Sequence, residues 1–76
     1  MSSKQIVSTE ELGKLIKKVR QAQKLTQPEL AGASGVGLRF IVDLEKGKPT
    51  CEVEKVLLVA SMLGIKIMAQ EPASYE

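Results

Sequence analysis

Residues 26–47 read TQPELAGASGVGLRFIVDLEKG, and this stretch decides the fold. It opens with Thr26, followed three residues later by Glu29, which is the pattern of a helix capping box. Pro28 falls in the first helical turn, where the missing backbone N–H does no harm. The stretch therefore predicts a short helix over residues 27–33.

A tight turn and a second helix follow. Gly35 can take the left-handed conformation that ends a helix, and residues 36–37 form the turn. The second helix is predicted over residues 38–46, and Gly47 stops it. The inward apolar side chains at helical spacing are Leu30, Ala31, Leu38, Ile41 and Leu44. A short capped helix, a tight turn and a second helix make a helix-turn-helix motif, a common DNA-binding unit. Phe40 then lies either in the core or against the sugar–phosphate backbone of the DNA.

Two further helices flank this motif. Ser8 and Glu11 form another capping box, so a helix should begin there and run to about Gln23. Its inward positions recur at helical spacing and are Leu12, Leu15, Ile16 and Val19. After the motif, Thr50 is expected to cap a fourth helix that ends near Leu63.

The fourth helix has more apolar residues than one face can hold. One stripe, expected to face the core, consists of Val53, Val56, Leu57, Ala60 and Leu63. A second stripe beside it consists of Leu58, Val59 and Met62. A helix that is apolar over so much of its circumference is buried on more than one side. In so small a chain we expect the second cover to be another subunit.

Residues 65–69 alternate β-branched residues with others, which indicates a strand. A lone strand leaves its backbone groups unpaired, so we expect it to pair with its copy across a two-fold axis. The predicted homodimer interface comprises Leu58, Val59, Met62, Ile65, Ile67 and Met68. The predicted fold class is all-α, with four to five helices in a single domain over residues 1–76. This domain has a helical core at 8–64, a dimerisation strand at 65–70 and a flexible tail at 71–76.

The composition excludes several classes of protein. With 76 residues, the chain is long enough for one domain. Cys51 is its one cysteine and it has no histidine, so neither an intramolecular disulfide nor a zinc site is expected. We therefore expect no cofactor and no enzymatic activity. The first residues lack the apolar core of a signal peptide and no stretch is long enough to span a membrane, so a cytoplasmic protein is expected.

Charge is unevenly distributed along the chain. Residues 1–48 carry nine Lys or Arg and five Asp or Glu, whereas residues 49–76 carry two and four. A basic first part suggests a polyanionic partner, and an acidic second part suggests a different partner on another side.

The helix-turn-helix stretch resembles the lambda-repressor-like (XRE-type) family. The family pattern is Thr/Ser-Gln-x-x-Leu-Ala, then Gly-Val-Ser, then Ile-x-x-Leu/Phe-Glu-x-Gly. The matching residues are Thr26, Gln27, Leu30, Ala31, Gly35, Val36, Ile41, Leu44, Glu45 and Gly47. Gly37 departs from the pattern, because the family usually has a capping Ser or Thr there and glycine caps less well. The resemblance spans about residues 12–64 and implies a DNA-binding transcriptional regulator.

The chain also resembles a narrower group, the HipB-type antitoxins, through the run RFIVDLEKGKPT at residues 39–50. A strand after the fourth helix fits these antitoxins too, since they dimerise partly through such strands. The resemblance implies a kinase-like toxin as partner and autorepression of the operon. The alternatives are a stand-alone regulator without a toxin and a protein-interaction module with secondary DNA binding.

The predicted DNA-binding residues are Gln27, Gly37, Leu38, Arg39, Val42, Asp43, Lys46 and Lys48. Arg39 points outward early in the reading helix, where a bidentate contact to guanine is the commonest specific readout; the alternative is a solvated or phosphate-bound arginine. Leu38 and Val42 are both candidates for contacts with thymine methyl groups. The alternative is that Leu38 packs inward and that Val42 stays exposed without a contact. Two reading helices in a dimer would lie about 34 Å apart and read a palindromic operator in double-stranded DNA.

The polar candidates are an aspartate, a glutamine and two lysines. Asp43 accepts a hydrogen bond from cytosine N4, or it repels wrong sequences, or it forms a local salt bridge. Gln27 begins a helix aimed at the DNA backbone, and members of the family use this residue on phosphate or to buttress the reading helix. Lys46 and Lys48 follow the reading helix and are expected at phosphates.

Three further residues are assigned to structure. Arg20 and Glu45 match a family pair that forms a partly buried salt bridge between the first and third helices. Cys51 is expected to be a small packing residue at the start of the fourth helix. The alternative for Cys51 is a redox-sensitive thiol whose pKa is lowered by the helix N-terminus.

Overall fold

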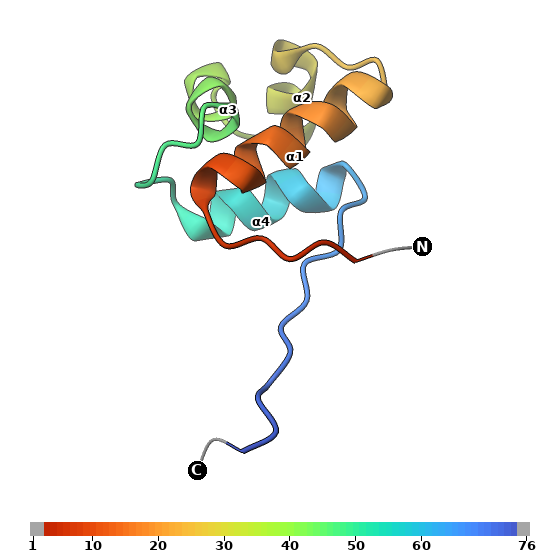
Figure 1. Cartoon of the computed structure of the whole chain (residues 1–76). Helices are drawn as coiled ribbons and strands as arrows, with labels where there is room; N and C mark the ends of the chain where they lie inside the picture. Colours follow the sequence, from red (N-terminus) through yellow and green to blue (C-terminus); the bar gives the residue numbers. More distant parts are fainter. Residues whose placement is uncertain (1–2, 75–76) are drawn as a thin grey trace.

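The computed structural model describes residues 3–74, and all regular secondary structure in this range is helical. The helices are α1 (Thr9–Ala22), α2 (Gln27–Ser34), α3 (Leu38–Glu45) and α4 (Val53–Met62). Helix α3 packs on α1 and on α2, and α2 packs on α4 (Figure 1). The all-α prediction is confirmed, and α1, α2 and α3 keep their predicted bounds to within one residue.

The caps of α1 and α2 explain where these helices begin. At α2 the capping box is complete: the Thr26 hydroxyl accepts from the Glu29 N–H (3.1 Å), and the Glu29 carboxylate accepts from the Thr26 N–H (2.8 Å). At α1 the Ser8 hydroxyl accepts from the Glu11 N–H, but the Glu11 carboxylate accepts from the N–H of Val7, one residue further back. Both caps satisfy N–H groups that a helix start otherwise leaves without a partner.

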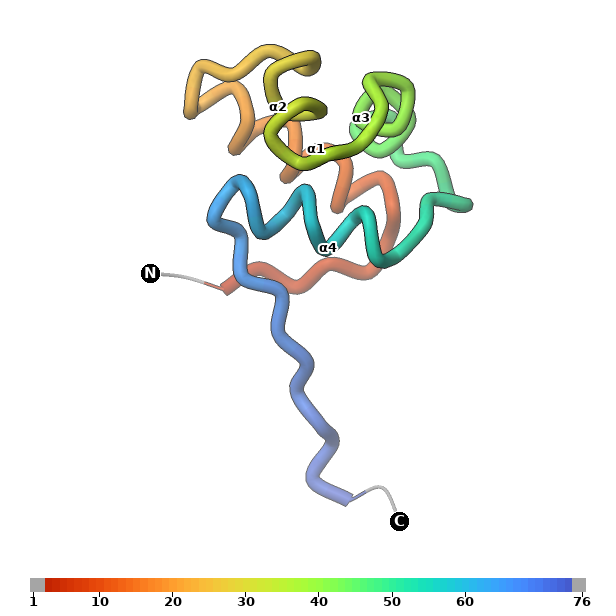
Figure 2. Tube along the Cα trace, turned by 180° about the vertical axis from the view of Figure 1, so that it is seen from behind, coloured from red at the N-terminus to blue at the C-terminus, as the bar shows by residue number. Residues whose placement is uncertain are grey.

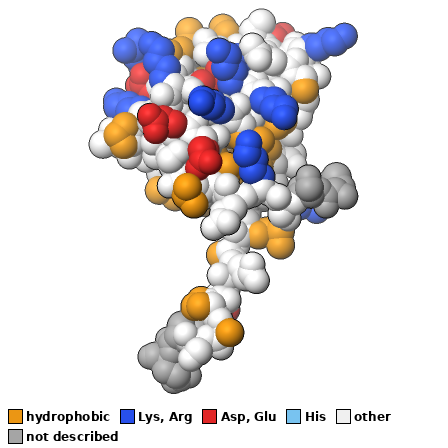
Figure 3. Space-filling model, in the orientation of Figure 1, with side chains coloured by type: hydrophobic (Ala, Val, Ile, Leu, Met, Phe, Trp, Pro, Cys, Tyr) orange, Lys and Arg blue, Asp and Glu red, His pale blue; other side chains and the backbone are white. Residues whose placement is uncertain are grey.

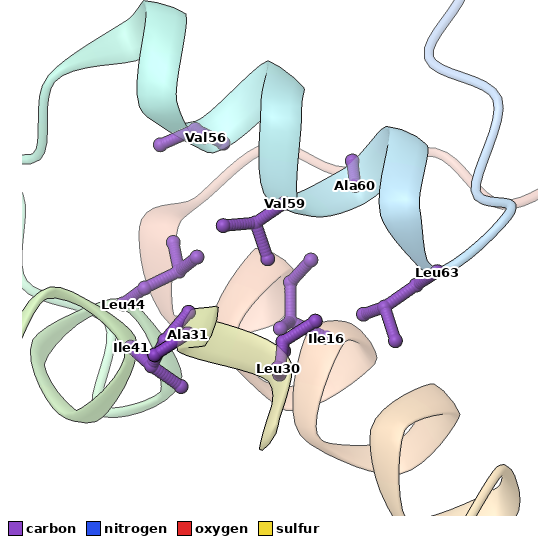
Figure 4. Close-up of a cluster of buried hydrophobic side chains, with 9 residues drawn as sticks. All are labelled: Ile16, Leu30, Ala31, Ile41, Leu44, Val56, Val59, Ala60 and Leu63. Carbon is purple, nitrogen blue, oxygen red and sulfur yellow. The ribbon is translucent and has the colours of Figure 1, made fainter. Parts of the chain in front are cut away.

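The core is assembled from all four helices (Figure 4). Each helix contributes one large side chain that is fully buried: Ile16 from α1, Leu30 from α2, Ile41 from α3 and Val59 from α4. The cluster is completed by Ala31, Leu44, Val56, Ala60 and Leu63. Burial of these aliphatic groups is the main favourable term in the folding of so small a domain.

Helices α1 and α3 approach closely at Gly13. A Cβ atom on Gly13 would overlap the carbonyl oxygens of Leu44 and Glu45, the last two residues of α3. At the same place, the Thr9 hydroxyl donates to the carbonyl oxygen of Gly47 (2.8 Å). The absence of a side chain at Gly13 therefore lets α1 lie directly against the end of α3.

The start of α4 differs from the prediction. Residues 49–50 lie in a turn, the helix begins at Val53, and Glu52 occupies the N-cap position without a side-chain hydrogen bond. Thr50 as the helix cap is therefore wrong. It lies too far before the first helical turn for its hydroxyl to serve the N–H groups of that turn.

Helix α4 is also rotated about its axis relative to the prediction. Its buried side consists of Val56, Val59 and Ala60, and Leu63 continues this side just after the helix. These four residues have the helical spacing i, i+3, i+4 and i+7. The predicted core residues Val53 and Leu57 are instead exposed. Val59 as an interface residue is wrong, because it is fully buried in the core. Since the helix is apolar on two sides, periodicity alone left its rotation undetermined.

After α4 the chain leaves the helical body. Residues 66–74 extend away from it (Figures 1 and 2). No strand forms within residues 3–74 of the single chain, where the segment at 65–70 has no partner for its backbone groups. The strand expected there, which pairs with a second copy, stays a prediction. Among the helices of residues 3–74, none combines the length and apolar character needed to cross a membrane.

Candidate nucleic-acid interface

Helix α2, the turn at residues 35–37 and α3 form a helix-turn-helix. Gly35 ends α2 with a φ of 71°, a left-handed value that glycine adopts without steric cost. The Val36 N–H donates to the carbonyl oxygen of Ala31 (3.0 Å) and closes the turn. Gly37 is the N-cap of α3 and supplies no side-chain hydrogen bond, as its departure from the family pattern predicts.

The outer side of α3 is open to solvent. Leu38 is 48% exposed, and the Arg39 side chain is 83% exposed. Val42 is half-buried and Lys46, at the C-cap, is exposed. Ile41 and Leu44 are in the core, so the helix has one anchored side and one side available to a ligand. The inward position predicted for Leu38 is wrong, because Leu38 lies on the solvent side of the first turn.

A buried ion pair holds α3 against α1. Arg20 donates to both carboxylate oxygens of Glu45, through Nε (2.6 Å) and Nη2 (3.1 Å), and through Nη1 to the carbonyl oxygen of Leu25 (2.7 Å). The two side chains are 9% and 3% exposed. The hydrogen bond with Glu45 raises the pKa of Arg20, and this bidentate geometry is the strongest form of an Arg–carboxylate contact. The pair implied by the family resemblance is thus present.

Gln27, the first residue of α2, contributes to the same network. It is half-buried, and its side-chain amide donates to Oε1 of Glu45 (3.0 Å). The buttressing contact considered for Gln27 is therefore formed. A contact between Gln27 and phosphate stays a prediction.

Asp43 lies between two basic side chains. Its Oδ1 is 3.4 Å from Nε of Arg39, one turn earlier in α3, and its Oδ2 is 3.5 Å from Nζ of Lys48. The backbone N–H of Lys48 also donates to the carbonyl oxygen of Asp43 (3.0 Å). The local salt bridge considered for Asp43 is therefore formed, and it connects the outer side of α3 with the loop that follows.

Phe40 and Cys51 contribute to packing. Phe40 lies half-buried against the core, and Nζ of Lys55 is 5.9 Å from its ring centroid, within range of a cation–π contact. Cys51 is half-buried, and burial raises the pKa of its thiol. The alternative of a thiol with a lowered pKa is wrong, because Cys51 lies before the first residue of α4 and the loss of solvation dominates.

Sequence reasoning missed three contacts that position the site. These are Gly13 beneath the end of α3, the Thr9 hydroxyl on Gly47, and Lys55 over Phe40. Only the first left a signal, since glycine inside an amphipathic helix is unfavourable by about 1 kcal/mol relative to alanine and so indicates a close contact.

A second exposed surface is apolar. We call it the apolar face of α4, and it comprises Leu58 and Met62, which lie one helical turn apart and are 49% and 50% exposed. Val53 and Leu57 are exposed on the opposite flank of the same helix. Beyond it, Ile65 is half-buried, and Ile67 and Met68 are exposed on the extended segment. Figure 3 shows basic side chains over the helical body and apolar ones along the extended segment. Exposed apolar groups that adjoin one another mark a protein–protein contact.

Fold and site together define a helix-turn-helix domain. The chain belongs to the helix-turn-helix family, since residues 16–68 match the model of the family described as "Helix-turn-helix". It is 54% identical over 65 residues to the "Uncharacterized HTH-type transcriptional regulator y4mF" of Sinorhizobium fredii (strain NBRC 101917 / NGR234), a match that covers 86% of each chain. The predicted membership of the XRE-type helix-turn-helix family is confirmed, and the protein is an HTH-type transcriptional regulator.

Solved structures with a similar fold include those described as "HipB-O4 20mer complex" and "Structure of HipA-HipB-O2-O3 complex". Each matches with a TM-score of 0.82 and 23% sequence identity, over 91% of this chain and 97% of the other. At this level of identity the similarity shows a common fold.

Proposed function

We propose that this regulator is a sequence-specific repressor that inserts α3 into the major groove of DNA. The observation that carries the proposal is the division of α3 into two sides. Its last residue, Glu45, is held by Arg20 and Gln27, whereas Leu38 and Arg39 are exposed at its N-terminal end. A helix with a fixed orientation and accessible N-terminal side chains is what reading of base edges requires.

Each outer residue has a role in this proposal. Arg39 reads guanine through two parallel hydrogen bonds to O6 and N7. Leu38 and Val42 contact thymine methyl groups, and Lys46 and Lys48 neutralise phosphates. Because each neutralised phosphate releases condensed counterions, affinity falls steeply as the salt concentration rises.

The proposal includes a homodimer. A second copy covers the apolar face of α4, and the two segments at residues 65–70 pair with each other. That pairing supplies the backbone partners that the segment lacks in the single chain. The two copies of α3 then lie about 34 Å apart and read a palindromic operator.

We also propose that the protein is the antitoxin of a HipBA-like pair, which neutralises a kinase-like toxin and represses its own operon. Support comes from the run at residues 39–50 and from the fold common to HipB, which one solved structure contains together with HipA. Acidic residues outnumber basic ones in residues 49–76, a different part of the chain from Arg39, Lys46 and Lys48, the proposed DNA contacts. A stand-alone regulator without a toxin is the alternative.

Fluorescence anisotropy tests the DNA proposal. The probes are a labelled duplex from the region upstream of the protein's own gene and a scrambled duplex of the same length. We expect the wild type to prefer the upstream duplex, and Arg39→Ala to lose about 1–3 kcal/mol of that preference. Lys17→Ala, which removes an exposed charge from α1, is the matched control and should keep it. Equal binding of both duplexes by the wild type would exclude a sequence-specific repressor and favour a protein-interaction module.

Co-expression with the adjacent genes tests the antitoxin proposal. We expect a product with a kinase fold to co-purify with this protein and its toxicity to be relieved. If the neighbouring genes encode no such protein, the stand-alone regulator is the correct reading.

A further inference from the structure

We propose that Asp43 is a positioning residue that determines specificity, because it orients the Arg39 guanidinium toward guanine. The inference rests on the proposed function of α3 in reading DNA. Its starting observation is that Oδ1 of Asp43 faces Nε of Arg39 at 3.4 Å.

The atom that Asp43 faces decides what Arg39 can still do. A guanidinium has five N–H donors in a planar fork. Contact through Nε leaves the outer edge of the guanidinium free, where each terminal Nη group has one N–H and the two N–H bonds are parallel. Two such parallel donors match the O6 and N7 acceptors of guanine. Arg39 can therefore be held by Asp43 and read guanine at the same time.

The two side chains differ in how firmly they are placed. The Asp43 side chain is only 20% exposed, against 83% for Arg39. Asp43 is also connected to Lys48 twice, by the ion pair at Oδ2 and by the backbone hydrogen bond. The carboxylate, with contacts on both sides, thus restricts the exposed Arg39 side chain, which reduces the conformational entropy that Arg39 loses on binding a base.

The carboxylate also has a cost. A negative charge on the outer side of α3 repels phosphates and the acceptor atoms of bases. This repulsion acts on every sequence, but a guanine opposite Arg39 offsets it. Asp43 therefore lowers affinity for DNA in general and raises the preference for the correct sequence.

The test measures selectivity in Asp43→Asn, which removes the charge and keeps the shape. Duplexes are first selected from a random library with the full-length wild type, and Kd is then measured for the selected and for a scrambled duplex. In Asp43→Asn we expect the ratio of the two Kd values to fall about tenfold, since positioning accounts for part of the discrimination of a bidentate pair. The scrambled duplex should bind more tightly, and repeated selection should show a relaxed preference at one guanine.

Arg39→Lys shows whether Asp43 acts through Arg39. It keeps the positive charge but has no planar fork. In the Arg39→Lys background, Asp43→Asn should leave the ratio unchanged. Glu71→Gln, at an exposed residue beyond the proposed pairing segment at 65–70, is the charge-matched control and should leave the ratio at the wild-type value. Asp43→Ser serves as a second variant without the carboxylate if thermal melts show that Asp43→Asn does not fold.

The outcomes separate the two proposals. A wild type that selects no sequence from the library contradicts the proposed DNA-reading function itself. A selective wild type whose ratio is kept by Asp43→Asn overturns the role of Asp43 alone. The same fall in both the wild-type and the Arg39→Lys backgrounds would also overturn it, because Asp43 would then act without Arg39.

Discussion

Three nitrogens of the Arg20 guanidinium donate to acceptors from two other parts of the chain. Glu45 accepts from two of them and the carbonyl oxygen of Leu25 accepts from the third. Because both charged side chains are buried, removal of one leaves the other without a partner in a medium of low dielectric constant. The single pair thus affects the stability of the loop after α1 and the orientation of α3 together.

Replacement of Arg20 should therefore be costly. We expect Arg20→Ala to lower the free energy of unfolding by about 3–5 kcal/mol, measured by urea denaturation. Gln27→Ala, which removes one neutral donor from Glu45, should cost only about 1–3 kcal/mol. Equal stability of Arg20→Ala and the wild type would contradict a structural role for the pair.

Cys51 should behave as an unreactive thiol near neutral pH. Burial raises its pKa, so the folded state disfavours the thiolate, which is the reactive form. The corresponding contribution to stability is present below the ordinary thiol pKa and is lost as pH rises through the raised value. Iodoacetamide labelling followed by mass spectrometry should be slower in the native protein than in urea. Equal rates near neutral pH would contradict the prediction.

At the scale of the helices, the crossing of α1 and α3 depends on a side chain that is absent. Gly13 brings the α1 backbone against the carbonyl oxygens at the end of α3. In isolation, alanine would favour α1 by about 1 kcal/mol over glycine. Packing and helix propensity therefore predict opposite signs for the change in stability caused by Gly13→Ala. The overlap with backbone atoms of α3 is the larger effect, so the change should be destabilising.

We expect Gly13→Ala to destabilise the protein by about 1–3 kcal/mol, since the backbone of α3 has to move. Gly32→Ala in α2 is the matched control. Gly32 is exposed and a Cβ there meets nothing within 4 Å, so this variant should gain about 0.5–1 kcal/mol. Thermal melts of both variants give the comparison, and a Gly13→Ala variant as stable as Gly32→Ala would contradict the close contact.

At the scale of the whole molecule, the two exposed surfaces have different proposed roles. The outer side of α3 carries the residues that read DNA, and the apolar face of α4 contacts the second copy of the chain. Burial of half-exposed Leu58 and Met62 in a second copy removes apolar area from water. Because a domain of this size buries only a small core by itself, this additional burial stabilises it.

We expect Leu58→Glu to shift the protein to the monomer and to weaken its binding to a palindromic duplex, because a charge would be buried at the interface. Sedimentation equilibrium measures the first effect and anisotropy the second. Val7→Glu, at an exposed apolar residue before α1, is the control and should leave both unchanged. A Leu58→Glu protein that keeps the wild-type mass would exclude this face from the interface.

The helices that the sequence predicted correctly are those marked by local signals. The capping box at Thr26, the Ser8 cap and the left-handed Gly35 act within four or five residues along the chain, so they can be recognised without knowing the fold. The pattern in residues 26–47 therefore predicted α2, α3 and the helix-turn-helix. At the site, the exposure of Arg39 followed from its place in that pattern.

The tertiary structure alone decided what depends on residues far apart in the chain. Because helix α4 is apolar on both sides, its own sequence does not determine which side is buried. In the fold α4 packs on α2, Val59 is in the core and Leu57 is exposed. The fit of Gly13 against α3 also required both helices to be in place. The segment at residues 65–70 also depends on contacts outside itself. A strand needs a second strand for its backbone hydrogen bonds, and in the single chain none is present beside this segment.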